Sequence, residues 1–191
     1  MEELKLIQET PDIYASEAMK SYIQHEVSNP RKKWILDIVH GKREQGKVKL
    51  RTPNLVLIST FVQPHTPMHS QAFHWLAIVT DESLCTLRDL KGEGVSMLRN
   101  LYTKSCTKIK AETGIDPEHV EAYVHYPPSV YRLHVHFVYP KQLCTQPPSR
   151  MHPLAKIISQ LEDDSDFYTK CSLEVPVFTS MELYHVYSRT N

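Results

Sequence analysis

The sequence carries no net charge, no long apolar run and no paired cysteine motif, and each absence excludes a class of protein. Its 22 Lys and Arg residues balance 22 Asp and Glu residues. The chain therefore lacks the broad basic surface with which proteins of long nucleic acids neutralise phosphates. No run reaches the roughly 20 apolar residues that span a bilayer. We expect neither a long nucleic acid as a partner nor a role in a membrane.

The few cysteines are widely spaced and contain no Cys-x-x-Cys pair. No basic segment follows Met1, so we expect no signal peptide. Reduced thiols in a cytoplasmic or nuclear protein are the expected state of the four cysteines, which are Cys85, Cys106, Cys144 and Cys171.

The length of 191 residues and a hydrophobic content of 41% suit one domain with an appended arm. Residues 12–28 have loosely helical apolar spacing, and the pair Asn29-Pro30 predicts the end of this helix. We therefore expect residues 1–30 to form an N-terminal helical arm that lies at a homodimer interface.

Apolar patterns in the rest of the chain predict an antiparallel sheet with flanking helices. We expect strands over residues 34–39, 47–50, 55–59 and 73–80, the last of them central and buried on both faces. Helical spacing predicts helices over residues 93–113, ending at Gly114, and from about Pro153 to Leu161. Residues 163–191 suggest a short helix and a terminal strand.

The most regular alternation of polar and apolar residues lies between residues 131 and 138. In a strand successive side chains point to opposite faces, so Arg132, His134 and His136 share one face. Residues 120–126 alternate in the same way, and residues 127–130 predict a turn.

A simple hairpin would bring six polar groups onto one surface. If Tyr126 lies opposite Tyr131, the expected pairs are His125 with Arg132, Tyr123 with His134, and Glu121 with His136.

These motifs resemble the histidine-triad (HIT) superfamily and, more closely, the C-terminal catalytic region of its scavenger mRNA-decapping enzymes. The resemblance covers roughly residues 20–165 and implies an α+β, HIT-like catalytic domain over residues 31–191. It is carried by Val124-His125-Tyr126, Pro128-Ser129 and Tyr131–Phe137, and upstream by Trp34–Ile38, Leu55–Ile58, Thr86–Leu90 and Leu98–Asn100.

The resemblance implies hydrolysis of the triphosphate bridge in 7-methylguanosine cap dinucleotides or short capped RNA, with release of 7-methylguanosine monophosphate. His134 matches the nucleophile, which forms a covalent nucleotidyl-histidine, and His136 matches a catalytic residue that orients or polarises the site. His125, Ser129 and Arg150 match positions that bind phosphate. Neither a metal nor another cofactor is implied.

For the cap base, the resemblance implies that Trp34 stacks on the guanine and that Glu44 accepts hydrogen bonds from its edge. A 7-methylated guanine carries positive charge, which favours stacking on the electron-rich indole. A carboxylate in turn requires donors on the base edge, as guanine has.

The sequence departs from the family pattern at two places. Arg132 replaces the first histidine of the signature, so a permanent cation stands where the family has an imidazole. It either binds phosphate or slows turnover, because a guanidinium cannot act as a general acid at neutral pH. Thr60 and Val62 stand where the family has an acidic residue and a lysine.

Three functions stay open on this basis: a cap hydrolase, a catalytically impaired cap-binding or regulatory protein, and a general HIT nucleotide hydrolase. Trp34 and Glu44 argue against the third, although a tryptophan in an apolar segment is more often part of the core. A metal site at His65, His69 and His74 is not expected, since no cysteine or carboxylate pattern completes a tetrahedral set.

Overall fold

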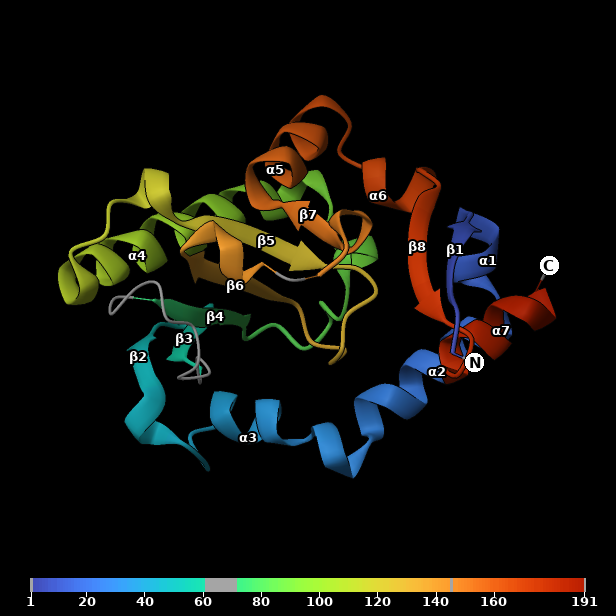
Figure 1. Ribbon diagram of the computed structural model, residues 1–191, viewed down its shortest axis with the longest axis horizontal. Helices are drawn as coiled ribbons and strands as arrows, with labels where there is room; N and C mark the ends of the chain where they lie inside the picture. Colours follow the sequence, from blue (N-terminus) through green and yellow to red (C-terminus); the bar gives the residue numbers. More distant parts are fainter. Residues whose placement is uncertain (1, 61–71, 145, 191) are drawn as a thin grey trace.

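The computed structural model describes residues 2–60, 72–144 and 146–190. Six antiparallel strands form one sheet in the order β2-β3-β4-β6-β5-β7, with helices on both faces (Figure 1). This confirms the predicted α+β class with an antiparallel sheet. The strands of this sheet are β2 Val48–Arg51, β3 Leu55–Ser59, β4 Phe73–Val79, β5 Glu121–His125, β6 His134–Tyr139 and β7 Met151–Pro153.

The helices differ widely in length. The α-helices are α1 Pro11–Ala15, α2 Glu17–Ser28, α3 Trp34–Val39, α4 Val95–Thr113, α5 Leu154–Asp163, α6 Phe167–Lys170 and α7 Glu182–Thr190. Short 3₁₀ turns are η1 Pro30–Lys32, η2 Gln45–Lys47, η3 Leu87–Asp89, η4 Gly92–Gly94, η5 Pro117–His119, η6 Lys141–Leu143 and η7 Pro148–Arg150. Within the described ranges, none of the helices has the length and apolar character that crossing a membrane requires.

The two faces of the sheet are buried against different helices. On one face, apolar side chains such as Val135 and Phe137 of β6 join one core cluster with Leu98 and Leu101 of α4. On the other face, α3 covers β3 and β4. The part of this second face that belongs to β5 and β6 carries His125, His134 and His136, and it is therefore the polar part of the interior.

The predicted strand over residues 34–39 is wrong, because these residues form helix α3. The run of β-branched and aromatic residues favours a strand locally. Ile35, Ile38 and Val39, however, are spaced as i, i+3 and i+4 and are the buried residues of the segment. Packing of this helical stripe on β3 and β4 decides the structure.

Most other predicted elements are confirmed. The strands predicted over residues 47–50, 55–59 and 73–80 are β2, β3 and β4, and β4 is central, with buried residues on both faces. The helices predicted over residues 93–113 and from Pro153 are α4 and α5. Gly114 ends α4 with a positive φ of 77°, a conformation that glycine adopts without steric cost.

The two ends of the chain pack together beside the sheet (Figure 1). Strand β1, Leu4–Glu9, pairs antiparallel with β8, Leu173–Phe178, and α2 packs against α7. The helix predicted over residues 12–28 is present but breaks at Ser16, whose hydroxyl caps α2. Strand β1 was not predicted. The short helix and the strand predicted within residues 163–191 correspond to α6 and β8, but this strand is not terminal, because α7 follows it. The division at residue 30 and its dimer interface stay predictions.

A buried ion pair joins these terminal segments to the sheet. Glu9 of β1, which is 0% exposed, accepts a hydrogen bond from Arg88 Nε at 2.9 Å. The same carboxylate accepts hydrogen bonds from the hydroxyls of Tyr126 at 2.5 Å and Tyr187 at 2.6 Å. Arg88 also donates to two main-chain carbonyls of the α6 segment. The pair is therefore well coordinated, as a buried charge requires.

We predict that Glu9→Gln lowers the free energy of unfolding by about 3–5 kcal/mol, because the buried guanidinium of Arg88 loses its counter-charge. Urea unfolding followed by circular dichroism measures the change. Glu174→Gln is the matched control, because Glu174 lies exposed on β8. Equal unfolding midpoints for the two variants would show that the terminal segments do not depend on this pair.

Candidate active site

The histidine cluster lies on the sheet face that α3 partly covers. His134 and His136 project from β6, and Tyr123 and His125 project from the neighbouring strand β5 onto the same face. The alternation of side chains in a strand produces this arrangement, since every second residue shares a face.

The predicted register of the hairpin is wrong by two residues. Tyr123 lies opposite His136 and not opposite His134. The reason is that β6 begins only at His134: the Leu133 amide donates to the Leu84 carbonyl at 2.8 Å, outside the hairpin. A shift by an even number of residues leaves every side chain on its predicted face, so the histidines still converge.

His136 lies at the centre of the cluster. Its ring stacks on Tyr123 with centroids 5.1 Å apart and an interplanar angle of 6°. The centroids of His125 and His134 lie 4.1 Å and 5.0 Å away. His74 of β4 places its Nε2 2.8 Å from Nδ1 of His136. The Nε2 atoms of His136 and His125 are buried and have no hydrogen-bond partner among the described residues.

His134 is held in one tautomer by the main chain. Its Nδ1 lies 2.7 Å from the carbonyl oxygen of Arg132, which can only accept a hydrogen bond. Nδ1 therefore carries the proton, and Nε2 carries a lone pair. Burial lowers the pKa of His134, and the charge of Arg150 lowers it further, whereas the hydrogen bond to the carbonyl raises it. The result is a neutral imidazole with a free nucleophilic nitrogen.

Burial keeps the other histidines of the cluster neutral as well. It lowers the pKa of His125 to about 3, with the charge of Arg150 as the next cause. It lowers the pKa of His136 well below the usual value, and the neighbouring histidines add to the shift. The pKa of His74 is lowered mainly by burial. The site therefore combines uncharged imidazoles with the permanent cations Arg132 and Arg150.

Arg132 was expected on the same strand as His134 and His136, but it precedes β6, which begins at His134. Only 4% of it is exposed, and its guanidinium approaches the Thr80 carbonyl at 3.4 Å and the Glu82 carboxylate at 3.5 Å. It lines a crevice of about 170 Å³, open solvent included, together with His125 and His134. The structure thus brings a cation next to the histidine that the sequence predicts as the nucleophile.

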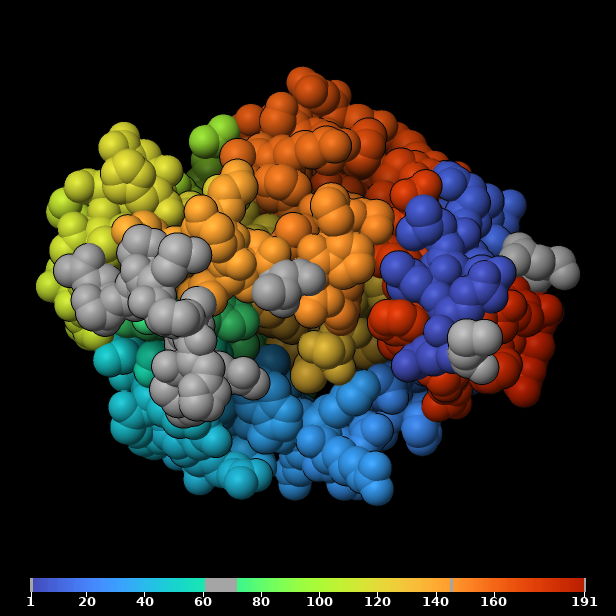
Figure 2. All heavy atoms as spheres, viewed as in Figure 1, coloured from blue at the N-terminus to red at the C-terminus, as the bar shows by residue number. Residues whose placement is uncertain are grey.

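Arg150 and Ser129 belong to the segments around this crevice. Arg150 is half-buried, donating to the Pro127 carbonyl at 3.1 Å and to the Gln146 side chain at 2.8 Å. Ser129 is exposed in the loop between β5 and β6. In the space-filling view the atoms of α2 and α3 lie close to this loop (Figure 2).

The predicted cap-binding residues, Trp34 and Glu44, make none of the described contacts with the histidine cluster. Trp34 begins α3 and packs, half-buried, against the apolar residues between α3 and the sheet. Glu44 is exposed, has a positive φ of 51° and forms an ion pair with Lys47 at 3.0 Å. Their predicted roles are not tested by these contacts. Thr60 bonds the main chain of His74, and Val62, His65 and His69 lie outside the described residues.

His74 is the member of the cluster that sequence reasoning missed. It was considered only as a metal ligand, because two other histidines precede it. The available signal was its position as a polar residue in the otherwise apolar strand β4. In the described part of the chain, no group of three or more His, Cys, Asp or Glu residues is placed to hold a metal ion.

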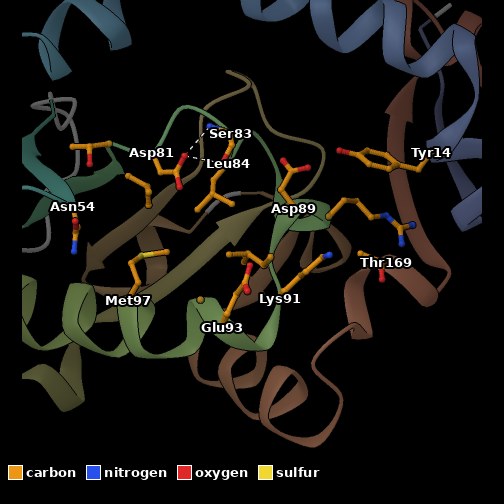
Figure 3. Close-up of a pocket in the computed structure, with 15 residues that line it drawn as sticks. Tyr14, Asn54, Asp81, Ser83, Leu84, Asp89, Lys91, Glu93, Met97 and Thr169 are labelled. Atoms are coloured by element: carbon orange, nitrogen blue, oxygen red, sulfur yellow. Dashed lines mark hydrogen bonds between the residues drawn. The ribbon is translucent and has the colours of Figure 1, made fainter.

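A larger cavity, about 1380 Å³ with open solvent included, lies elsewhere (Figure 3). Asp81 and Asp89 line it, and Met97 of α4 and Tyr14 of α1 face it from other elements. None of the predicted site residues lines this cavity. This cavity and the histidine cluster are therefore different places in the molecule.

Comparison with known proteins finds relatives named m7GpppX diphosphatase. The chain is 28% identical over 179 residues to m7GpppX diphosphatase of Caenorhabditis elegans, which covers 90% of this chain and 55% of the relative. It is 29% identical over 183 residues to m7GpppX diphosphatase of Homo sapiens, which covers 90% of this chain and 51% of the relative. The chain thus spans about half the length of these curated relatives.

A solved structure described as Hnt3 in complex with DNA and guanosine is 12% identical and covers 72% of this chain and 97% of that chain, with a TM-score of 0.38. This likeness is too low to compare individual residues. Residues 33–152, well over half of the chain, match the family model described as Scavenger mRNA decapping enzyme C-term binding. The match includes both strands of the histidine hairpin, and the predicted resemblance is confirmed. This chain belongs to the scavenger mRNA-decapping enzyme family, in which it carries the C-terminal region.

Proposed function

We propose that this protein hydrolyses the triphosphate bridge of 7-methylguanosine cap dinucleotides or short capped RNA remnants, with His134 as the nucleophile. The main support is the hydrogen bond from His134 Nδ1 to the Arg132 carbonyl, which leaves Nε2 with a lone pair. The name of these relatives, m7GpppX diphosphatase, describes the same class of reaction.

In the proposed reaction, Nε2 of His134 attacks the phosphorus nearest the methylated guanosine. The P–N bond forms as the bond to the bridging oxygen breaks, and the remaining nucleoside diphosphate leaves with the electron pair. Water then cleaves the P–N bond, releases 7-methylguanosine monophosphate and restores His134. Dividing the displacement into two steps is the usual advantage of a covalent intermediate.

Arg132 and Arg150 supply charge in this scheme. A terminal phosphate has a second pKa of about 6, so the diphosphate leaves as an anion at neutral pH without a strong general acid. A guanidinium can stabilise this anion with two parallel hydrogen bonds. His125, Ser129 and His136 complete the phosphate site in this scheme. The Nε2 atoms of the two histidines have no partner within the described ranges and are available to phosphate.

In this proposal Trp34 and Glu44 bind the methylated guanine of the cap. Trp34 lies on α3, on the side of the sheet that carries the histidines. Glu44 exchanges its exposed ion pair with Lys47 for donors on the guanine edge, an exchange of low cost because exposed pairs contribute little.

A cap-binding protein with impaired turnover is the second candidate. Two observations favour it: His134 is only 6% exposed, and the crevice beside it leaves almost no volume for a ligand. Turnover therefore requires this crevice, which Thr86 and Pro128 also line, to widen.

We expect the purified protein to release 7-methylguanosine monophosphate from m7GpppG in the absence of added metal. His134→Ala removes the nucleophile and lowers turnover by more than about a thousandfold. Chromatography of the products measures both, with unmethylated GpppG as the substrate control.

His119→Ala is the control for the variant, because His119 is an exposed histidine on η5. Turnover that persists in His134→Ala excludes the proposed nucleophile. Absence of turnover in the wild type, with tryptophan fluorescence quenched by m7GpppG but not in Trp34→Leu, selects the cap-binding alternative.

We predict that the acidic limb of the pH profile of kcat/KM lies below pH 6.5. His134 attacks only as a neutral imidazole, and burial lowers its pKa from the ordinary value of about 6.5. The rate therefore stays level as the pH falls to about 6.5 and declines only below it. A limb centred above pH 7 in initial-rate measurements would contradict the assignment.

We predict that Arg132→Ala lowers kcat/KM roughly tenfold to a thousandfold, because a donor to the phosphate oxygens is lost. The position of the acidic limb stays nearly unchanged, since the carbonyl that holds His134 belongs to the main chain. Arg132→His tests the opposite view. If turnover appears only in that variant, the arginine blocks catalysis and the impaired-enzyme reading holds.

A further inference from the structure

We propose that His74 is a positioning residue of this site: it donates a hydrogen bond to Nδ1 of His136 and so keeps the Nε2–H of His136 directed at substrate phosphate. The inference rests on the proposed function for its substrate. Its structural part, the donor and acceptor roles of the two rings, is independent of any activity.

The contact is short and its geometry is well defined. Nε2 of His74 lies 2.8 Å from Nδ1 of His136, and the two rings meet edge to edge and nearly coplanar, with centroids 5.1 Å apart at an interplanar angle of 24°. His74 itself is fixed by its main chain, because its carbonyl accepts hydrogen bonds from Thr60 Oγ1 at 2.6 Å and from the Thr60 amide at 2.9 Å. A rigid strand thus presents the imidazole.

Only one proton can occupy the contact between the two nitrogen atoms. If His136 donates it, its Nε2 is an acceptor and repels phosphate oxygens, which can only accept. If His74 donates it, the Nε2 of neutral His136 carries a proton. The proposed site requires the second arrangement, because the Nε2 of His136, which has no partner among the described residues, would face phosphate oxygens that can only accept a hydrogen bond.

The other groups around His136 contact its ring but form no hydrogen bond with it among the described residues. Tyr123 stacks on it, and His125 and His134 contact it at ring distances of 4.1 Å and 5.0 Å. These contacts fix the plane of the ring, whereas the hydrogen bond from His74 distinguishes its two nitrogens. Arg150 acts on His136 only through its charge.

Two variants separate the hydrogen bond from the packing. His74→Phe keeps an aromatic ring and removes the donor, whereas His74→Gln keeps an N–H donor and removes the ring. His152→Gln is the matched control, because His152 is a half-buried histidine whose strand partner, Val124, belongs to the core on the opposite face of the sheet. If His74→Phe does not fold, His74→Met replaces it.

The first readout is the two-bond ¹H–¹⁵N spectrum of the histidine rings without substrate, assigned with His136→Asn. We expect Nδ1 of His136 to appear as an unprotonated, hydrogen-bonded nitrogen in the wild type and in His74→Gln. In His74→Phe the nitrogen loses this bond, and its signal moves or its proton redistributes. An unchanged spectrum, or a wild-type proton on Nδ1, overturns the inference.

The second readout is the separation of kcat from KM for m7GpppG. We expect His74→Phe to lower kcat roughly tenfold to a hundredfold with KM within about twofold, as for other residues that orient a catalytic group. His74→Gln and His152→Gln should stay within about threefold of the wild type. Equal losses in His74→Phe and His74→Gln would mean that only packing matters. If the wild type is inactive, the proposed function fails and the spectrum alone decides the role of His74.

Discussion

The buried ion pair between Glu9 and Arg88 is the constraint on which the rest of the structure depends. Arg88 lies two residues after Thr86, and Tyr126, which bonds the same carboxylate, directly follows His125. Thr86 and His125 both line the crevice beside His134. The strand β1 at one end of the chain therefore supports two walls of the site. Since an uncompensated buried charge is costly, the terminal segments and the histidine hairpin hold together as a unit.

Burying the polar groups of this site also lowers the stability of the fold. Four histidines share a region that burial keeps uncharged, and two of them leave a buried nitrogen without a partner among the described residues. Each unpaired polar group costs about 1–3 kcal/mol. A core of apolar residues at these positions would be more stable. That the sheet instead carries imidazoles beside two guanidinium groups is the physical argument for chemistry on phosphate, because such sites commonly give up stability for function.

The sequence predicted the face of each residue in the hairpin but not its partners. Alternation has a period of two, so the side on which His134 and His136 lie does not depend on register. The register itself depends on the bond between Leu133 and Leu84, which is remote in sequence. The same limit explains β1, whose pairing with β8 joins the two ends of the chain. Helix α3 was mistaken for a strand because local propensity and tertiary packing disagree there, and His74 was missed because its meaning depends on a neighbouring strand.

Residue 132 has two roles, one for its main-chain carbonyl and one for its side chain, and an arginine at this position changes only the second. Its carbonyl oxygen fixes the tautomer of His134, and a main-chain group serves this purpose whatever side chain is attached. The side chain instead determines charge and proton transfer. An imidazole at this position can titrate, whereas a guanidinium remains a cation at every physiological pH. In the proposed reaction the leaving group is a diphosphate, which needs stabilisation of its charge more than it needs a proton. The nucleophile therefore keeps its orientation, and the arginine changes the way in which the leaving group is assisted.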